Sequence, residues 1–245
     1  MGTRAQAPSA RHIGIAAVSP EGAAVFYSQL SRQLARLAPP DSHPRVTMHN
    51  EPLCLYIDAI RRDDWHAVGE MLRRSAEVLA RAGAEFCLSP DNIVQHAAHL
   101  AESGSPIPWL TMSDLVAASV EQDGRRTVGL IGTKMVTSAS TYQTHLGVRG
   151  IHVIPPEVAE AEALDRIIFQ ELLFGQIHPE SRRAVLGIIQ NLPDRGCEAV
   201  ILACSEAPLL VTPENSCLPV YDAANILAEA SAKRSFAVAT AAAEG

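Results

Sequence analysis

Short apolar runs that end in small and polar residues recur along the chain, and they predict buried parallel strands. One run, residues 200–202, leads into Ala203-Cys204-Ser205-Glu206, where the strand is expected to give way to a helix. An earlier run within residues 83–92 keeps the same order of Gly, Glu and apolar positions, with Asp91 in place of Cys204. The pattern predicts a carboxylate and a thiol at matching ends of two strands.

A second pair of stretches repeats in the same way: residues 12–19 match residues 127–134, at nearly the same spacing as the first pair. We interpret the chain as two copies of one α/β unit, in which Asp91 and Cys204 face each other across a cleft. The alternative is that the stretches share only the general pattern of parallel-sheet strands.

Apolar residues at helical spacing fill the intervals between strands, and this alternation predicts parallel sheets. The first helix begins at Ser19-Pro20-Glu21, which combines a capping hydroxyl, an early proline and a first-turn carboxylate. Strands are predicted over residues 13–18, 45–48, 86–89, 128–131, 151–154, 200–202 and 218–222. Helices are predicted over residues 20–37, 65–82, 92–103, 113–121, 138–146, 160–173, 181–192 and 223–236.

We therefore predict an α/β fold with two pseudo-symmetric domains, each a parallel sheet flanked by helices, and an active site in the interdomain cleft. Residues 11–105 plus 213–245 form the predicted N-terminal domain, and residues 106–212 form the second α/β domain. Residues 1–10 are expected to be a disordered leader, and the Ala/Glu/Gly-rich tail is expected to fray.

Composition narrows the classes of function. A content of 47% hydrophobic and 19% charged residues is ordinary for a globular protein, and a net charge of −7 without a long basic cluster argues against nucleic acid as a partner. The apolar runs are too short for a membrane span, and the start lacks a secretory apolar core. We expect a cytoplasmic protein that does not bind membranes.

Five cysteines without CxxC spacing predict neither a disulfide framework nor a zinc site. Cys54, Cys87, Cys197 and Cys217 are interpreted as small core residues. His96 and His99 lie three apart, but no third ligand stands near them in the sequence, so we interpret them as surface histidines and expect no metal.

Ligands of parallel sheets bind beyond the carboxyl ends of the strands, and helix N-termini there favour an anion such as a carboxylate. The same field is expected to lower the pKa of Cys204 and make this thiol a base or nucleophile. Lys134 or Arg45 is a weaker candidate for a distal carboxylate, since lone basic residues are usually solvated. The candidates for binding a substrate carboxylate are Ser19, Asn92, Thr133 and Ser205, with Ser19 and Ser205 alternatively serving only as helix caps.

Residues 196–210, GCEAVILACSEAPLL, resemble the second catalytic signature of the cofactor-independent aspartate/glutamate racemase family, GADAVILGCTELPLL. Residues 14–27, 129–142 and 219–228 resemble three further segments of that family, and the resemblance spans about residues 11–236. It implies two α/β domains with the site between them, a homodimer, and chemistry without pyridoxal phosphate or metal. In that chemistry two opposed thiols exchange the α-proton of an amino acid.

Residue by residue, Cys204 matches the second thiol, Ser205 its neighbouring threonine, and Asn92 the asparagine of the first signature, PCNT. Asp91 replaces the first thiol and Ile93 replaces the threonine that follows. Further replacements remove two threonines and a histidine at positions 223, 224 and 227, which makes the expected pocket more apolar and weakens the case for aspartate or glutamate as substrate.

The function expected from these residues is that of an isomerase: a racemase or epimerase that acts at the α-carbon of an amino acid or related carboxylate. Cys204 and Asp91 form its acid–base pair, because desolvation and an anionic substrate raise the pKa of Asp91 and allow it to donate a proton. The alternatives are a one-cysteine decarboxylase or isomerase of the same superfamily and a non-catalytic carboxylate-binding homologue.

Overall fold

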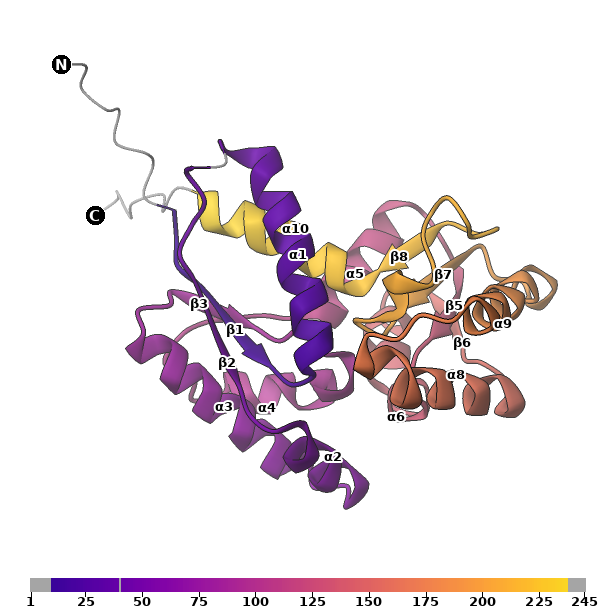
Figure 1. Cartoon of the computed structure of the whole chain (residues 1–245), viewed down its shortest axis with the longest axis horizontal. Helices are drawn as coiled ribbons and strands as arrows, with labels where there is room; N and C mark the ends of the chain where they lie inside the picture. The colour runs from indigo at the N-terminus through magenta and orange to yellow at the C-terminus, as the bar shows by residue number, and fades with distance from the viewer. Residues whose placement is uncertain (1–9, 40, 238–245) are drawn as a thin grey trace.

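Eight strands form two parallel sheets in the computed structural model, which describes residues 10–39 and 41–237. The first sheet has the order β2-β1-β3-β4 and the second the order β6-β5-β7-β8, and every pairing is parallel. Figure 1 shows the sheets in two neighbouring lobes. The two sheets follow one topology, so the predicted fold of two parallel sheets flanked by helices is confirmed.

The strands are short, as expected for buried parallel strands. Their bounds are β1 Ile13–Ala17, β2 Val46–Asn50, β3 Phe86–Leu88, β4 Trp109–Leu110, β5 Thr127–Ile131, β6 His152–Ile154, β7 Ala199–Leu202 and β8 Val220–Asp222. The expected leader apart from Ala10, and the expected frayed tail beyond residue 237, lie outside the described residues.

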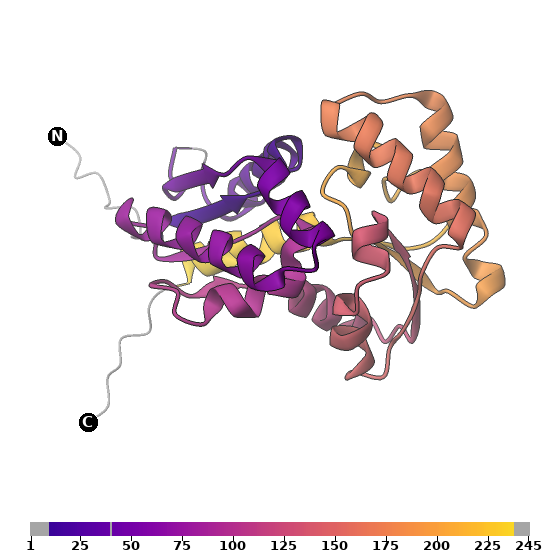
Figure 2. The same ribbon diagram turned by 90° about the horizontal axis from the view of Figure 1, so that it is seen from below.

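Helices cover the faces of both sheets (Figures 1 and 2). The α-helices are α1 Pro20–Leu37, α2 Leu53–Arg61, α3 Trp65–Arg81, α4 Ala98–Glu102, α5 Met112–Gln122, α6 Lys134–Thr137, α7 Thr141–Gly147, α8 Val158–Gln170, α9 Pro179–Gln190 and α10 Ala223–Phe236. Short 3-10 helices are η1 Asn92–Ala97, η2 Leu172–Phe174, η3 Pro193–Arg195 and η4 Ala207–Leu209. None of the described helices has the length and apolar content needed to cross a membrane.

Two predicted helices are broken. Residues 92–103 form the 3-10 helix η1 followed by α4, and residues 138–146 fall partly in the gap between α6 and α7. Asp91 precedes η1 but does not cap it, because its carboxylate accepts hydrogen bonds from backbone N–H groups at the end of β1 instead. The helix that starts after Ser19 forms as predicted, with Pro20 in its first turn.

The chain passes between the sheets later than the expected crossing points. Strand β4 follows residue 105 but pairs with β3 of the first sheet, and β8 follows residue 212 but pairs with β7 of the second. Helix α10 then returns to pack against α1 and α5, so the end of the described chain lies beside its first helix (Figure 1). Gln29 in α1 donates to Asp222 Oδ2 at 2.7 Å and supports this return.

Successive residues in the central strands face different cores, because strand side chains alternate between the two faces of a sheet. Ile13 and Ile15 of β1, and Leu130 of β5, belong to one shared core that also contains residues of α1, α5 and α10. The opposite faces pack into separate cores, represented by Ala16 in the first lobe and Ile131 in the second. The shared core therefore extends through both lobes.

Matching glycines mark the turns that lead into β3 and β7. Gly83 has φ +91° and Gly196 has φ +80°, a backbone conformation that favours glycine. This agrees with the internal repeat inferred from sequence. Among the cysteines, Cys87 and Cys197 are buried as predicted, whereas Cys54 and Cys217 are exposed, so the prediction that they are core residues is wrong. Cys54 lies in the first turn of α2 and Cys217 in the loop before β8, and neither side chain is enclosed there.

Leu130→Ala is expected to lower the free energy of unfolding by about 2–5 kcal/mol, because the fully buried side chain leaves a cavity in the shared core. Leu37→Ala is the matched control, since Leu37 at the end of α1 is 48% exposed. Urea denaturation measures both. Equal losses for the two variants would contradict the assignment of Leu130 to this core.

Candidate active site

A pocket lies at the carboxyl ends of the strands, and both lobes contribute to it. The six sequence-predicted side chains all line this pocket: Ser19, Asp91, Asn92, Thr133, Cys204 and Ser205. They follow β1, β3, β5 and β7, the central strands of the two sheets. The remaining lining residues are Leu53, Ile57, Ile93, Ile168, Phe169, Leu173, Ala203 and Glu206.

Asp91 is a buried carboxylate with both oxygens engaged. Its Oδ2 accepts from Val18 N and its Oδ1 from Ser19 N, each at 3.0 Å. Burial raises the pKa of Asp91 to about 7, and the neighbouring Glu206 carboxylate adds to the increase. The two backbone hydrogen bonds oppose this shift without cancelling it. Asp91 is thus able to exist in either protonation state near neutral pH.

Cys204 is buried and hydrogen-bonded to a second carboxylate. Its Sγ donates to Glu206 Oε2 at 3.1 Å. Burial, followed by the charge of Glu206, raises the pKa of Cys204 well above its ordinary value. The expectation of a lowered pKa is therefore wrong. The predicted helix after the thiol is only the three-residue 3-10 helix η4. The backbone N–H groups of Glu206 and Ala207 lower the pKa of Cys204, but by less than desolvation raises it.

Glu206 is a site residue that the sequence analysis does not predict. It is 4% exposed, and its Oε1 accepts from Ser19 Oγ at 2.6 Å while its Oε2 accepts from Cys204. Its position could have indicated this role, because Glu206 lies two residues after Cys204 in the segment that resembles the racemase signature. The carboxylate joins the thiol of the second lobe to the serine that caps α1 in the first.

A second hydrogen bond joins the lobes at the same place. Ser205 Oγ donates to the Pro90 carbonyl oxygen at 2.7 Å. The lobes approach so closely that a Cβ atom at Gly22 would lie 2.8 Å from both Glu206 Oε1 and Ser205 Cβ. Gly22 is thus required for the contact between α1 and the segment carrying Ser205 and Glu206.

Asn92 lines the pocket and has a buried amide donor without a partner in the part of the chain that the structure describes. Its Oδ1 accepts a hydrogen bond from Tyr142 OH at 2.5 Å, and this bond fixes the orientation of the amide group. The amide nitrogen Nδ2 then points away from Tyr142 OH. Asn92 is 7% exposed, and Nδ2 has no hydrogen-bond partner among the described residues. A buried N–H without a partner is costly. A carboxylate oxygen of a bound ligand would satisfy it.

The hydroxyl groups have mixed roles. Ser19 Oγ accepts from Gly22 N and Thr133 Oγ1 accepts from Val136 N, so both cap helices as well as lining the pocket. Ser205 caps no helix in the described part of the chain. Lys134 and Arg45 are exposed and outside the pocket lining, and Lys134 lies beside Glu162 instead.

Part of the pocket lining is apolar, and we call this part the apolar wall. Six side chains from both lobes form it: Leu53 and Ile57 of α2, Ile93 of η1, Ile168 and Phe169 of α8, and Leu173 of η2. No lysine or arginine lines the pocket among the residues that the structure describes. No sequence motif marks this wall, because its members come from four segments that only the fold brings together.

Comparison with known proteins identifies one family that the chain resembles over most of its length. The family model for Asp/Glu/Hydantoin racemase matches residues 15–231. A candidate Asp/Glu racemase from Yersinia pestis is similar at 27% identity and a TM-score of 0.82, over 92% of this chain and 99% of that one. An aspartate racemase homologue from Pyrococcus horikoshii OT3 is similar at 26% identity and a TM-score of 0.78, over 90% and 96%.

The aspartate racemase of Picrophilus torridus has the same fold, with 20% identity and a TM-score of 0.74 over 92% of this chain and 94% of that one. With a model that matches most of the chain and structures that align over nearly all of it, the protein belongs to the Asp/Glu/Hydantoin racemase family.

Proposed function

We propose that this protein is a cofactor-independent racemase or epimerase that acts at the α-carbon of an amino acid or related carboxylate. The observation that carries the proposal is the pairing of Cys204 and Asp91 in one pocket, each following an equivalent strand of its own sheet. The raised pKa of Asp91, about 7, suits a group that exchanges a proton near neutral pH. The pKa of Cys204 is raised well above its ordinary value, so this thiol keeps its proton and needs a proton acceptor when it acts as a base.

The proton transfers balance if Glu206 takes part. As Cys204 Sγ removes the α-proton, its own thiol proton passes to Glu206 Oε2, with which it is already hydrogen-bonded. Protonated Asp91 then gives its proton to the opposite face of the carbon. The enzyme finishes with an ionised Asp91 and an additional proton on the Cys204–Glu206 pair, and the reverse reaction restores the starting state.

Binding of the substrate carboxylate falls to Asn92 Nδ2, the donor without a partner. Ser205 and Thr133 line the same pocket. The apolar wall receives the substituent on the α-carbon. A second carboxylate there would meet no cation of the lining, so the substrate carries an apolar substituent rather than an acidic one. A homodimer and a cytoplasmic location stay predictions.

A one-cysteine decarboxylase or isomerase is the second candidate, and one observation favours it. Both oxygens of Asp91 accept backbone hydrogen bonds, at 3.0 Å each, which ties this carboxylate to the end of β1. If Asp91 serves only to hold the loop, Cys204 alone protonates one face of a carbanion.

The first test is hydrogen exchange at the α-carbon in heavy water, followed by proton NMR over a panel of D- and L-amino acids and related α-substituted acids. We expect wild type to exchange the α-proton, and Cys204→Ala and Asp91→Asn each to lower the rate by at least about 100-fold. Cys197→Ala is the matched control, because Cys197 is also buried in the second lobe but lies outside the pocket.

The outcomes separate the candidates. Exchange that needs Cys204 but survives Asp91→Asn contradicts the two-base mechanism and supports the one-cysteine enzyme. Exchange at the wild-type rate in Cys204→Ala overturns both.

The pH dependence of stability tests the state of Asp91. The pKa of Asp91 is about 7 in the folded protein and has its ordinary value of 3.8 in the unfolded chain. Between pH 3.8 and about pH 7 the folded protein therefore binds this proton and the unfolded chain does not. Stability therefore falls as pH rises through this window, by up to about 1.4 kcal/mol per pH unit. We expect Asp91→Asn to lose this slope in urea denaturation, and Asp41→Asn at an exposed site to keep it. A wild-type slope in Asp91→Asn would contradict the shift.

Substrate preference tests the apolar wall. Among substrates that exchange, we expect kcat/KM for an aliphatic or aromatic substituent to exceed that for aspartate by about tenfold or more. Leu53→Arg places a cation in the apolar wall and is expected to lower the ratio of the two kcat/KM values. Leu55→Arg is the matched control and is expected to leave this ratio unchanged, because Leu55 lies on the same helix but is 46% exposed and outside the pocket lining. A preference for aspartate in wild type would refute the assignment.

A further inference from the structure

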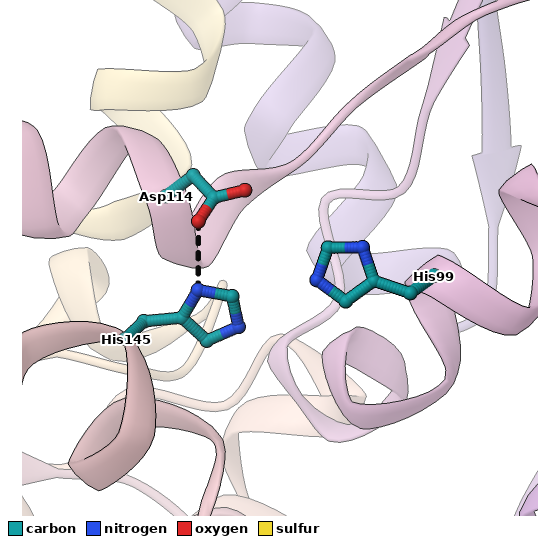
Figure 3. A group of neighbouring side chains, drawn as sticks. All are labelled: His99, Asp114 and His145. Atoms are coloured by element: carbon teal, nitrogen blue, oxygen red, sulfur yellow. Dashed lines mark hydrogen bonds and ion pairs between the residues drawn. The ribbon is translucent and has the colours of Figure 1, made fainter. Parts of the chain in front are cut away.

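A cluster of two histidines and an aspartate lies at the surface, apart from the pocket residues. His99 comes from α4, Asp114 from α5 and His145 from α7. Figure 3 shows the two imidazole rings side by side, with the Asp114 carboxylate next to His145. One ligand atom from each residue lies within 4.8 Å of the other two. Three helices that are separate in sequence thus bring three metal-binding side chains to one point.

We propose that His99, Asp114 and His145 bind one divalent transition-metal ion, with zinc as the best chemical match. Two imidazoles and a carboxylate form a ligand set typical of zinc sites that keep an open position, whereas calcium and magnesium prefer oxygen ligands alone. The fourth position of a tetrahedral ion is then open to water.

The present geometry is close to what such an ion needs. Bonds of about 2.0–2.2 Å to a tetrahedral ion hold ligand atoms roughly 3.3 Å apart. His145 Nδ1 and Asp114 Oδ1 are 2.7 Å apart, and the two imidazole rings have centroids 5.6 Å apart with only 19° between their planes. To bind one ion, His145 Nδ1 and Asp114 Oδ1 must move slightly apart, and His99 must move slightly closer to both. The side chain of His99 is exposed and has room for this movement.

The surroundings add negative charge. Glu102, on the same short helix as His99, has its Oε2 3.9 Å from His99 Nδ1. Two carboxylates therefore stand near the two imidazoles. A carboxylate that contacts a ligating histidine orients the ring and increases its basicity, which strengthens metal binding.

An ion at this position would link two segments that hold the pocket residue Asn92 in place. Helix α4 continues η1, which begins at Asn92, and α7 carries Tyr142, whose hydroxyl donates to Asn92 Oδ1. A metal that joins His99 of α4 to His145 of α7 therefore ties together the two segments that hold Asn92. Binding stabilises this part of the fold from outside the pocket and takes no part in the proton transfers.

The test is zinc binding to the full-length protein after treatment with a chelator and dialysis. Isothermal titration with zinc chloride is expected to show one saturable site per chain and an increase in Tm. His145→Ala and His99→Ala are each expected to weaken binding by about tenfold or more. His152→Ala is the matched control, since it removes an exposed histidine of the second lobe that is not in the cluster.

Cobalt distinguishes this site from the exposed thiols of Cys54 and Cys217. Cobalt bound by two imidazoles and a carboxylate absorbs in the visible range without the near-ultraviolet band that a thiolate ligand adds, and we expect that spectrum. A thiolate band that disappears in Cys54→Ser or Cys217→Ser would overturn the proposal. Binding unchanged in His145→Ala and His99→Ala, or the lack of a saturable site, would overturn it as well.

Discussion

The pocket depends on two hydrogen bonds that cross between the lobes. Ser19 Oγ in the first lobe donates to Glu206 in the second, and Ser205 Oγ in the second donates to the Pro90 carbonyl in the first. Each bond joins a residue that follows a central strand of one sheet to a residue that follows a central strand of the other. Because Gly22 has no side chain, α1 can approach closely enough to permit both. Relative movement of the lobes would separate Asp91 from Cys204.

The same contact explains the electrostatics of the site. Asp91, Cys204 and Glu206 are all buried where the lobes meet, and burial is the largest cause of the raised pKa values of Asp91 and Cys204. A thiol that keeps its proton must have an acceptor when it acts as a base, and Glu206 is hydrogen-bonded to it. Acid–base behaviour is thus a property of the assembled pocket and not of any one residue.

Asp91, at the position where the family resemblance implies a thiol, is fixed by the local structure. A carboxylate has two acceptor oxygens, and both are used by N–H groups at the end of β1. Asp91 is held more firmly than a thiol would be, because a thiol is only a weak hydrogen-bonding group.

The sequence by itself determined the two parallel sheets, the repeat and the six side chains at the strand ends, because strand periodicity and chain order place such residues at one edge of a sheet. It also determined the cap of α1 at Ser19. Only the tertiary structure decided the direction of the Cys204 pKa shift, the role of Glu206, the apolar wall and the meeting of His99 with His145. These depend on burial and on distances between segments far apart in the chain, which periodicity does not specify.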